Sequence, residues 1–273
     1  MPNTKLYRDL VSIPKRKPKR LYHYTSIKAL QQILKSKKIL STKISYLNDH
    51  SEAIEGYKLA KEIIKRKIQL NADAKNTLTK HIGPSPGNEF IFSFTELEDD
   101  LSYWKYYGKN GCYISIDTNS LIEYGKQNEK YYFGKCIYDQ FGKEKILNKY
   151  IDEYISEGDD EFPPYPINRV CNLLKNKSFR EENEWRLISR LLSYRNSEIE
   201  FICSNGIITP RHSIHFKDFD TFPIKEICIG PSDQISQKRN EDSVKGMIFQ
   251  YYQEDRGLYK KIKIKSSKVP FRS

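Results

Sequence analysis

The sequence lacks the marks of a membrane or secreted protein. No stretch approaches the roughly eighteen uninterrupted apolar residues that a membrane span needs, and the start MPNTKLYRDL has no apolar signal core. No internal repeat or low-complexity linker divides the chain either. We therefore expect a soluble, cytoplasmic protein with no membrane contact. It would have a single domain over residues 21–273, preceded by a basic extension over residues 1–20.

Cysteine pairs are also missing. The five cysteines are widely separated and form no CxxC motif, so neither a disulfide framework nor a zinc site is indicated. His212 and His215 in PRHSIHF have a ligand-like spacing but no acidic or cysteine partner nearby in sequence. An ordinary strand or loop pair explains them better, and we expect no metal site.

Acidic residues are scarce at both ends of the chain. The net charge is +12, of which residues 1–20 contribute +6 and residues 256–273 contribute +7, so the rest sums to −1. Two basic ends on a near-neutral body could hold a polyanion such as nucleic acid. Lysine-rich ends can equally serve solubility alone, and the sequence favours neither interpretation.

Aromatic residues are plentiful, with 20 Tyr and 13 Phe, which argues against disorder and for a folded α+β protein. The segment RLYHYTS reads as a strand, after which Ser26 caps a helix with apolar residues at helical spacing from Ile27. Farther along, EFIFSFT, CYISID and IKEICI read as strands, and LSYWKYYG as a helix. The tail GLYKKIKIKSS alternates Ile with Lys, which is typical of a strand with one solvent-exposed face.

Three short motifs are ambiguous on their own. In LYHYTS, a strand histidine, His23, meets a small polar turn, but such a histidine is more often structural than ligand-binding. Asn48 and Asp49 in YLNDHSE are explained as turn and cap residues. In LSYWKYYG, core packing is favoured for Trp104, while the tyrosines at 103, 106 and 107 could either pack or stack on a planar ring.

The motif EENEWR at 181–186 is the most informative. If it is a strand, Glu182, Glu184 and Arg186 project from one face, because strand side chains alternate with period two. Beside the apolar LISRLL, these three charges suggest a polar cleft. There the arginine would keep one carboxylate ionised while the other acts on a substrate.

Together these motifs carry a resemblance. HYTS followed by a helix, then YLND, FSFTE with its Trp and Tyr helix, ExEWR and IKEICIGP resemble the bacterial family named domain of unknown function 2971, over about residues 21–235. The opening LYHYTSIKALQQILKSKKIL also resembles NAD-dependent ADP-ribosyltransferases of the diphtheria-toxin, poly-ADP-ribose polymerase and DarT type. One departure is that the glycine usual in such proteins is absent near Lys37 and Lys38.

The resemblance implies a fold, a substrate and a set of site residues. The fold is an ADP-ribosyltransferase-like split β-sheet with flanking helices, and NAD lies between the two halves. The NAD-binding residues implied are His23, Tyr24, Thr25, Tyr106, Tyr107 and Arg186. Glu184 would hold the ribose 2′-OH and stabilise an oxocarbenium-like state. Glu182 would sit two residues earlier, as in transferases with a paired-glutamate turn, and would orient the acceptor. The motif does not decide which glutamate acts, nor which of Tyr24, Tyr106 and Tyr107 stacks on nicotinamide.

The leading functional hypothesis is thus an NAD-dependent ADP-ribosyltransferase, acting as a bacterial toxin or anti-phage defence effector. Its basic ends favour a nucleic-acid acceptor, and such a protein often has a neutralising antitoxin or defence partner. Two alternatives stay open: a non-catalytic nucleotide or nucleic-acid binding module, and an NAD glycohydrolase. The transferase hypothesis requires that His23 and Glu184, 161 positions apart, face one cleft.

Overall fold

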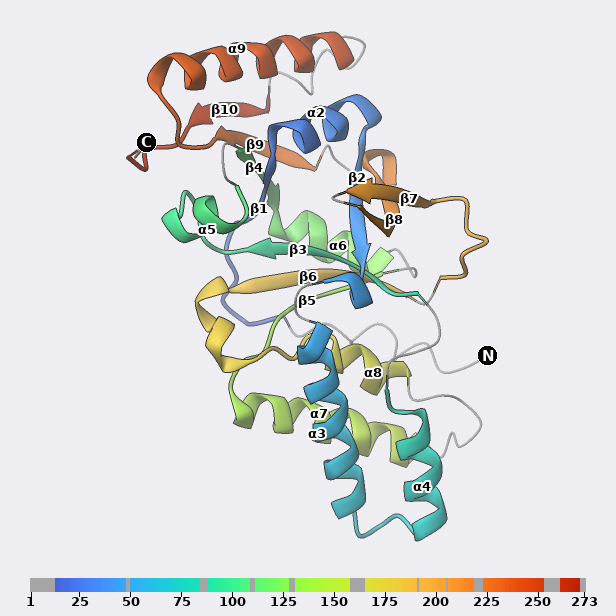
Figure 1. The fold of residues 1–273 in the computed structure, drawn as a ribbon. Helices are drawn as coiled ribbons and strands as arrows, with labels where there is room; N and C mark the ends of the chain where they lie inside the picture. Colours follow the sequence, from blue (N-terminus) through green and yellow to red (C-terminus); the bar gives the residue numbers. More distant parts are fainter. Residues whose placement is uncertain are drawn as a thin grey trace.

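A ten-stranded mixed sheet forms the centre of the molecule (Figure 1). The computed structural model describes residues 13–47, 50–83, 88–108, 111–127, 131–157, 165–190, 192–204, 206–218, 223–252 and 261–270. Its strands are β1 (Arg20–Ser26), β2 (Lys38–Lys43), β3 (Phe90–Thr95), β4 (Gly111–Asp117), β5 (Tyr131–Lys135), β6 (Glu184–Ser189), β7 (Ile199–Ser204), β8 (Ile207–His215), β9 (Ile224–Ile229) and β10 (Lys263–Ser266).

The sheet is split between β1 and β3. Its path runs β10-β9-β4-β1-β3-β2-β8-β7, with β6 pairing β3 and β5 pairing β6. Strand β1 pairs with β4 over seven residues, from Arg20 opposite Asp117 to Ser26 opposite Gly111. With β3, in contrast, β1 shares the single register pair Tyr22 and Thr95. The predicted α+β fold with a split sheet is therefore confirmed.

Helices lie at both ends of the sheet (Figure 1). The α-helices are α2 (Ile27–Ser36), α3 (His50–Arg66), α4 (Ala72–His81), α5 (Leu101–Tyr106), α6 (Thr118–Gln127), α7 (Gln140–Glu157), α8 (Tyr165–Cys171) and α9 (Gln234–Tyr251). Short 3₁₀ turns are η1 (Ile44–Tyr46), η2 (Lys177–Glu182) and η3 (Phe216–Asp218). Within the described ranges, no helix combines the length and apolarity that a bilayer crossing requires.

The apolar side chains gather in two main clusters. Helices α2, α6 and α9 pack with the strands around residues such as Leu34, Phe94 and Trp185. Helices α3, α4, α7 and α8 form a separate lobe around residues such as Ile64 and Ile151, at the opposite end from α9 (Figure 1). The chain enters this lobe after η1, returns to the sheet as β3, enters the lobe again after β5 and leaves it through α8 and η2.

Local chemistry explains the first strand-helix unit. The Ser26 side chain accepts a hydrogen bond from the Ala29 amide at 3.1 Å and caps α2, as predicted. At the other end, Lys37 adopts a left-handed conformation with φ of 53°. A glycine adopts this conformation at lower cost, so Lys37 occupies the turn in which the missing glycine was expected. Asn48 and Asp49 lie outside the described residues.

Candidate active site

A pocket lies where the two half-sheets separate. Strands β1 and β3, helix α5 and the η2–β6 turn line it. Six of the eight predicted site residues meet there, namely His23, Tyr24, Tyr107, Glu182, Glu184 and Arg186. Its volume is about 160 Å³, below the 300–1,000 Å³ typical of sites that enclose a whole drug-sized ligand. The pocket can therefore enclose one end of a dinucleotide.

His23 bridges the split. Its Nδ1 lies 2.9 Å from the carbonyl oxygen of Ser93 on β3. Because a carbonyl only accepts, Nδ1 carries the hydrogen, and Nε2 is the acceptor of the neutral ring. Burial lowers the pKa of His23 to about 4, so the ring is neutral at physiological pH. The histidine thus joins the half-sheets through one nitrogen and keeps the other as an acceptor.

Helix α5 forms an aromatic wall of the pocket. Asp100 caps the helix by accepting from the Ser102 and Tyr103 amides, and Asp99 accepts from Trp104 Nε1 at 2.8 Å. The Tyr24 ring packs edge-on against Trp104 with centroids 4.7 Å apart. Trp104 is buried, as predicted, and Tyr103 and Tyr107 line the pocket.

Two predicted residues do not line the pocket. Thr25 pairs with Cys112 of β4 within the sheet. Tyr106 is 71% exposed, with the Lys105 ammonium over its ring, whereas Tyr107 is 49% exposed and reaches the pocket. Adjacent residues of a short helix point about 100° apart, so the two tyrosines cannot share the same direction. Tyr107 is therefore the better placed of the pair to stack on a bound ring.

The expectation that Glu182 lies on a strand with Glu184 is wrong. Glu182 is the last residue of η2, and β6 begins at Glu184. Asn183 between them has a left-handed backbone, with φ of 44°. Asparagine is among the few residues that tolerate this region. This turn, and not strand alternation, brings the two glutamates to the same pocket.

Four charged side chains of the described residues form a cluster on the pocket floor. Arg186 donates from Nε to Glu184 Oε1 at 2.9 Å and from Nη2 to Oε2 at 3.0 Å. Lys175 Nζ donates to Glu184 Oε2 at 2.8 Å and also to Glu182 Oε2. Tyr107 donates to the remaining Glu182 oxygen, Oε1, at 3.1 Å. Within the part of the chain that the structure describes, two cations and two anions thus meet in a mostly buried space.

The cluster keeps Glu184 ionised. Burial by itself disfavours its charge, but Arg186 and Lys175 together lower the pKa of Glu184 to about 2. Burial likewise works against the charge of Lys175, yet its pKa is raised, chiefly by Glu184. Sequence reasoning missed Lys175. The available signal was a lysine directly after the buried pair Leu173 and Leu174, where a charge needs a partner.

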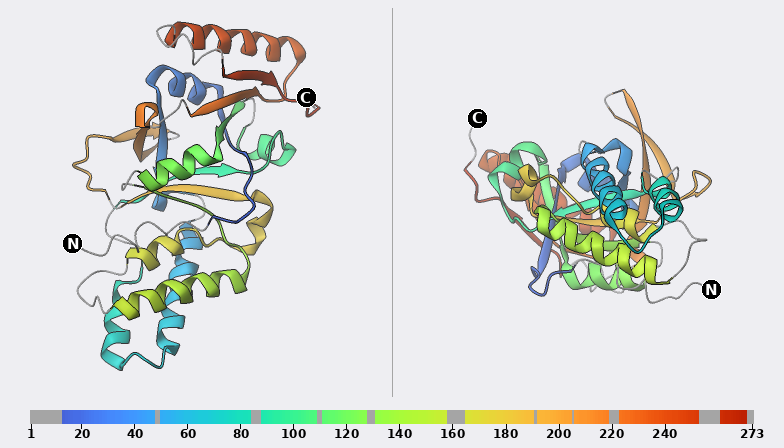
Figure 2. Two further views of the ribbon diagram at one scale, coloured as in Figure 1. Left: turned by 180° about the vertical axis from the view of Figure 1, so that it is seen from behind. Right: turned by 90° about the horizontal axis from the view of Figure 1, so that it is seen from below.

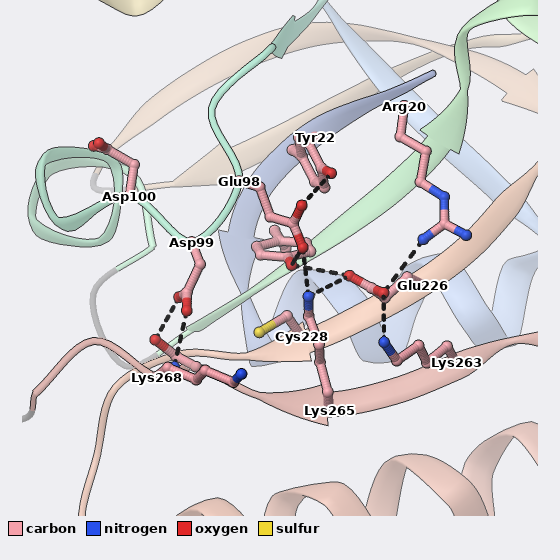
Figure 3. A network of polar contacts seen from close by, with 12 residues as sticks. Arg20, Tyr22, Glu98, Asp99, Asp100, Glu226, Cys228, Lys263, Lys265 and Lys268 are labelled. Atoms are coloured by element: carbon pink, nitrogen blue, oxygen red, sulfur yellow. Dashed lines mark hydrogen bonds and ion pairs between the residues drawn. The ribbon is translucent and has the colours of Figure 1, made fainter. Parts of the chain in front are cut away.

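A second polar network holds the segment between β3 and α5 (Figure 3). Glu98 accepts from Tyr22 at 2.7 Å and from Lys265 at 2.5 Å, and the bond to Lys265 is the main cause that lowers the pKa of Glu98. Lys265 also pairs with the buried Glu226 at 2.9 Å. Asp99 accepts from the Ser267 hydroxyl at 2.5 Å. Strand β10 therefore fixes the segment that leads into the aromatic wall.

The two basic ends differ in their partners. The predicted C-terminal strand is present as β10, and its Lys263 and Lys265 pair with Glu226 and Glu98. In the leader, Lys15, Arg16 and Lys17 are exposed and have no acidic partner among the described residues. At the start of the described leader, Ile13 and Pro14 border a hollow together with Arg180 and Asn183. From there the leader, in dark blue, leads into β1 (Figure 2). The leader therefore carries three adjacent exposed cations, whereas the two lysines of β10 are already paired.

Comparisons with known proteins confirm the resemblance for part of the chain. Residues 103–187 match the family described as "Protein of unknown function (DUF2971)". This segment carries the last four residues of α5, both glutamates and Arg186. No curated protein matches the sequence.

Two solved structures of DarT from Thermus sp. 2.9 are similar to this chain. The complex with NAD+ is 12% identical, with a TM-score of 0.37, and the match covers 93% of this chain and 97% of that one. The complex with ADP-ribosylated single-stranded DNA is 14% identical, with a TM-score of 0.34 and coverages of 89% and 92%.

Proposed function

We propose that the protein is an ADP-ribosyltransferase that uses NAD as its substrate. The observation that carries the proposal is the convergence of His23, Glu182 and Glu184 on one pocket at the split of the sheet. Cleavage of the bond between ribose and nicotinamide passes through an oxocarbenium-like state, which an adjacent carboxylate stabilises. A pocket that can enclose one end of a dinucleotide and that contains the carboxylates of Glu182 and Glu184 fits this chemistry.

The depth of each side chain suggests its role. The Glu184 side chain is 7% exposed and that of Glu182 19%, so a substrate that enters fully meets Glu184, and an acceptor from outside meets Glu182. Glu184 would accept a ribose hydroxyl, His23 Nε2 would accept another, and Tyr107 would stack on nicotinamide. Arg186, whose three nitrogens bind Glu184 and the Asn172 carbonyl, would act through Glu184.

These groups account for the bonds, the electron pair and the proton of the transfer. The bond between ribose C1′ and the nicotinamide nitrogen breaks, and nicotinamide leaves as a neutral molecule with the electron pair. The acceptor then forms a new bond to C1′ and loses its proton, for which Glu182 is the nearest accessible base. Glu184 remains an anion throughout, consistent with its low pKa of about 2.

The test is NAD consumption with and without acceptors. The protein is incubated with NAD alone and with single-stranded DNA, RNA or protein, while free nicotinamide and attached ADP-ribose are measured. We expect nicotinamide release coupled to acceptor labelling. Release of free ADP-ribose alone would identify a glycohydrolase, and intact NAD would favour a binding module.

We propose nucleic acid as the acceptor, held along the basic leader. The support is that Lys15, Arg16 and Lys17 are exposed and have no acidic partner within the described part of the chain, in contrast to the paired lysines of β10. Contacts to phosphates release counterions, so binding should weaken steeply with salt, with a log–log slope of roughly 0.7 per contact for single strands.

Charge-reversal variants distinguish a specific role of the leader in acceptor binding from an effect of the protein's net charge. Changing Lys15, Arg16 and Lys17 to Glu should reduce acceptor binding and labelling without altering NAD cleavage in the absence of acceptor. The matched control changes Lys58, Lys65 and Lys80, which are exposed on α3 and α4 in the helical lobe. Equal losses in both variants, or binding that ignores salt, would argue for a protein or small-molecule acceptor.

We further propose that the activity serves as a toxin or an anti-phage effector, with a neutralising partner. An enzyme that consumes NAD and modifies nucleic acid harms the cell that contains it unless it is restrained. Expression of the wild type should then arrest growth, and expression of a Glu182→Gln variant should not. Equal growth with both proteins would contradict this role.

A further inference from the structure

We infer that Lys175 is a positioning residue that holds the carboxylates of Glu182 and Glu184 side by side and ionised in the pocket. Its placement follows from the charge cluster itself, and only its consequence for catalysis rests on the proposed function. The side chain of Lys175 is 1% exposed. A lysine so deeply buried is rare unless it is paired.

The ammonium group is the element that joins the two glutamates. Lys175 Nζ donates to Oε2 of Glu182 and, at 2.8 Å, to Oε2 of Glu184. Arg186 binds Glu184 through Nε and Nη2 and donates a hydrogen bond from Nη1 to the Asn172 carbonyl at 2.8 Å. The backbone holds Lys175 in place, because its amide donates to the Ile137 carbonyl at 3.0 Å. The ring of Phe179 also lies 5.1 Å from Nζ.

The pair needs this cation because two carboxylates in one buried space repel each other. Without a shared cation, one of the two takes up a proton, as in other carboxylate pairs. Among the described residues, the titratable groups that face Lys175 and the pair are Arg186 on β6, Tyr103 on α5, Tyr107 directly after α5, Tyr138 after β5, and Tyr22, His23 and Tyr24 on β1. None of these tyrosines, nor the neutral histidine, supplies a positive charge. Of the described charges in the cluster, loss of Lys175 would leave the two glutamates with one cation, Arg186.

The first test measures titration directly and needs no NAD. Carbon-13 NMR of labelled glutamate carboxyl groups gives the pKa of Glu182 and Glu184. In Lys175→Met, we expect one of the two carboxyls to titrate at least about one pH unit higher than in the wild type. In the double variant Lys175→Met/Glu182→Gln, one anion again faces one cation, and the titration of Glu184 should return toward its wild-type position.

The second test is the pH profile of NAD cleavage. Its acidic limb should move upward in Lys175→Met by the same interval as the carboxyl titration, and Lys175→Arg should keep the wild-type limb. Absence of cleavage in the wild type would reject the transferase proposal while leaving the NMR result intact. Unchanged titration of both glutamates in Lys175→Met would overturn the inference about Lys175.

Folding failure is also informative. If Lys175→Met does not fold but Lys175→Met/Glu182→Gln does, the unbalanced anion is the reason and the inference stands. If both variants unfold to the same extent, Lys175 serves only to fill space, and the inference is overturned.

Discussion

Replacement of Glu184 by Gln should destabilise the protein strongly, in addition to abolishing NAD cleavage. The uncharged amide of the Glu184→Gln variant would leave Arg186 facing a neutral group and Lys175 with Glu182 as its remaining anion in the cluster, and breaking a buried ion pair costs about 3–5 kcal/mol. The pKa gives a similar magnitude. The pKa of Glu184 falls from 4.5 to about 2 on folding, and at about 1.4 kcal/mol per unit this contributes about 3 kcal/mol to stability.

The sign of the pH dependence follows from the depressed pKa. The contribution of Glu184 is complete above its unfolded pKa near 4.5 and is lost as the pH falls through about 2. Urea unfolding of the wild type and of Glu184→Gln should therefore differ by a constant amount between pH 5 and pH 8. The difference should narrow by about 2 kcal/mol between pH 5 and pH 3.

The exposed neighbour Glu181 provides the control for this experiment. Glu181→Gln removes the same charge three positions earlier, outside the cluster, and should change stability by less than about 0.5 kcal/mol. NAD cleavage by Glu184→Gln must be measured without urea, at a pH where the variant is folded. A loss of stability below about 1 kcal/mol, or a difference that does not change with pH, would refute the ion-pair reasoning.

Two further predictions concern the pocket. Burial lowers the pKa of His23 to about 4, so the neutral ring stabilises the fold fully above pH 6.5, and up to about 3 kcal/mol of this stability is lost as the pH falls to 4. In urea unfolding, the His23→Gln variant should lack this part of the pH dependence of the unfolding free energy. The same pH dependence in both proteins would contradict the burial of His23. Asn183→Ala should cost about 1 kcal/mol and slow NAD cleavage because alanine resists the left-handed turn, whereas Asn183→Gly should retain both; equal effects in thermal unfolding would argue against the turn.

Sequence patterns predicted the elements whose structure is set locally. The strand RLYHYTS became β1 with the predicted bounds to within one residue, because its alternation and the Ser26 cap depend on adjacent residues alone. The C-terminal alternation of Ile and Lys likewise became β10. The convergence of His23 and Glu184 was predicted from the family resemblance, and the pocket brings the two together.

Features that depend on a single backbone conformation or on distant packing could not be predicted. Period-two alternation placed Glu182 on a strand, but the left-handed Asn183 ends η2 and changes the direction of the chain at that point. The role of Lys175 depends on how the chain returns from α8 to β6, which no local pattern records. Similarly, Tyr106 and Tyr107 are adjacent tyrosines that no sequence pattern tells apart. The structure distinguishes them, because Tyr107 hydrogen-bonds to Glu182 whereas Tyr106 is exposed.

The position of β10 in the chain has a consequence for synthesis. During translation, β1 with His23, η2 with Glu182 and β6 with Glu184 leave the ribosome well before residues 263–267. The pocket floor can therefore form in a growing chain whose aromatic wall still lacks the contacts of Lys265 with Glu98 and of Ser267 with Asp99. The wall of the pocket is thus fixed after the floor, so under the proposed function full activity would wait for the synthesis of β10 and of Ser267.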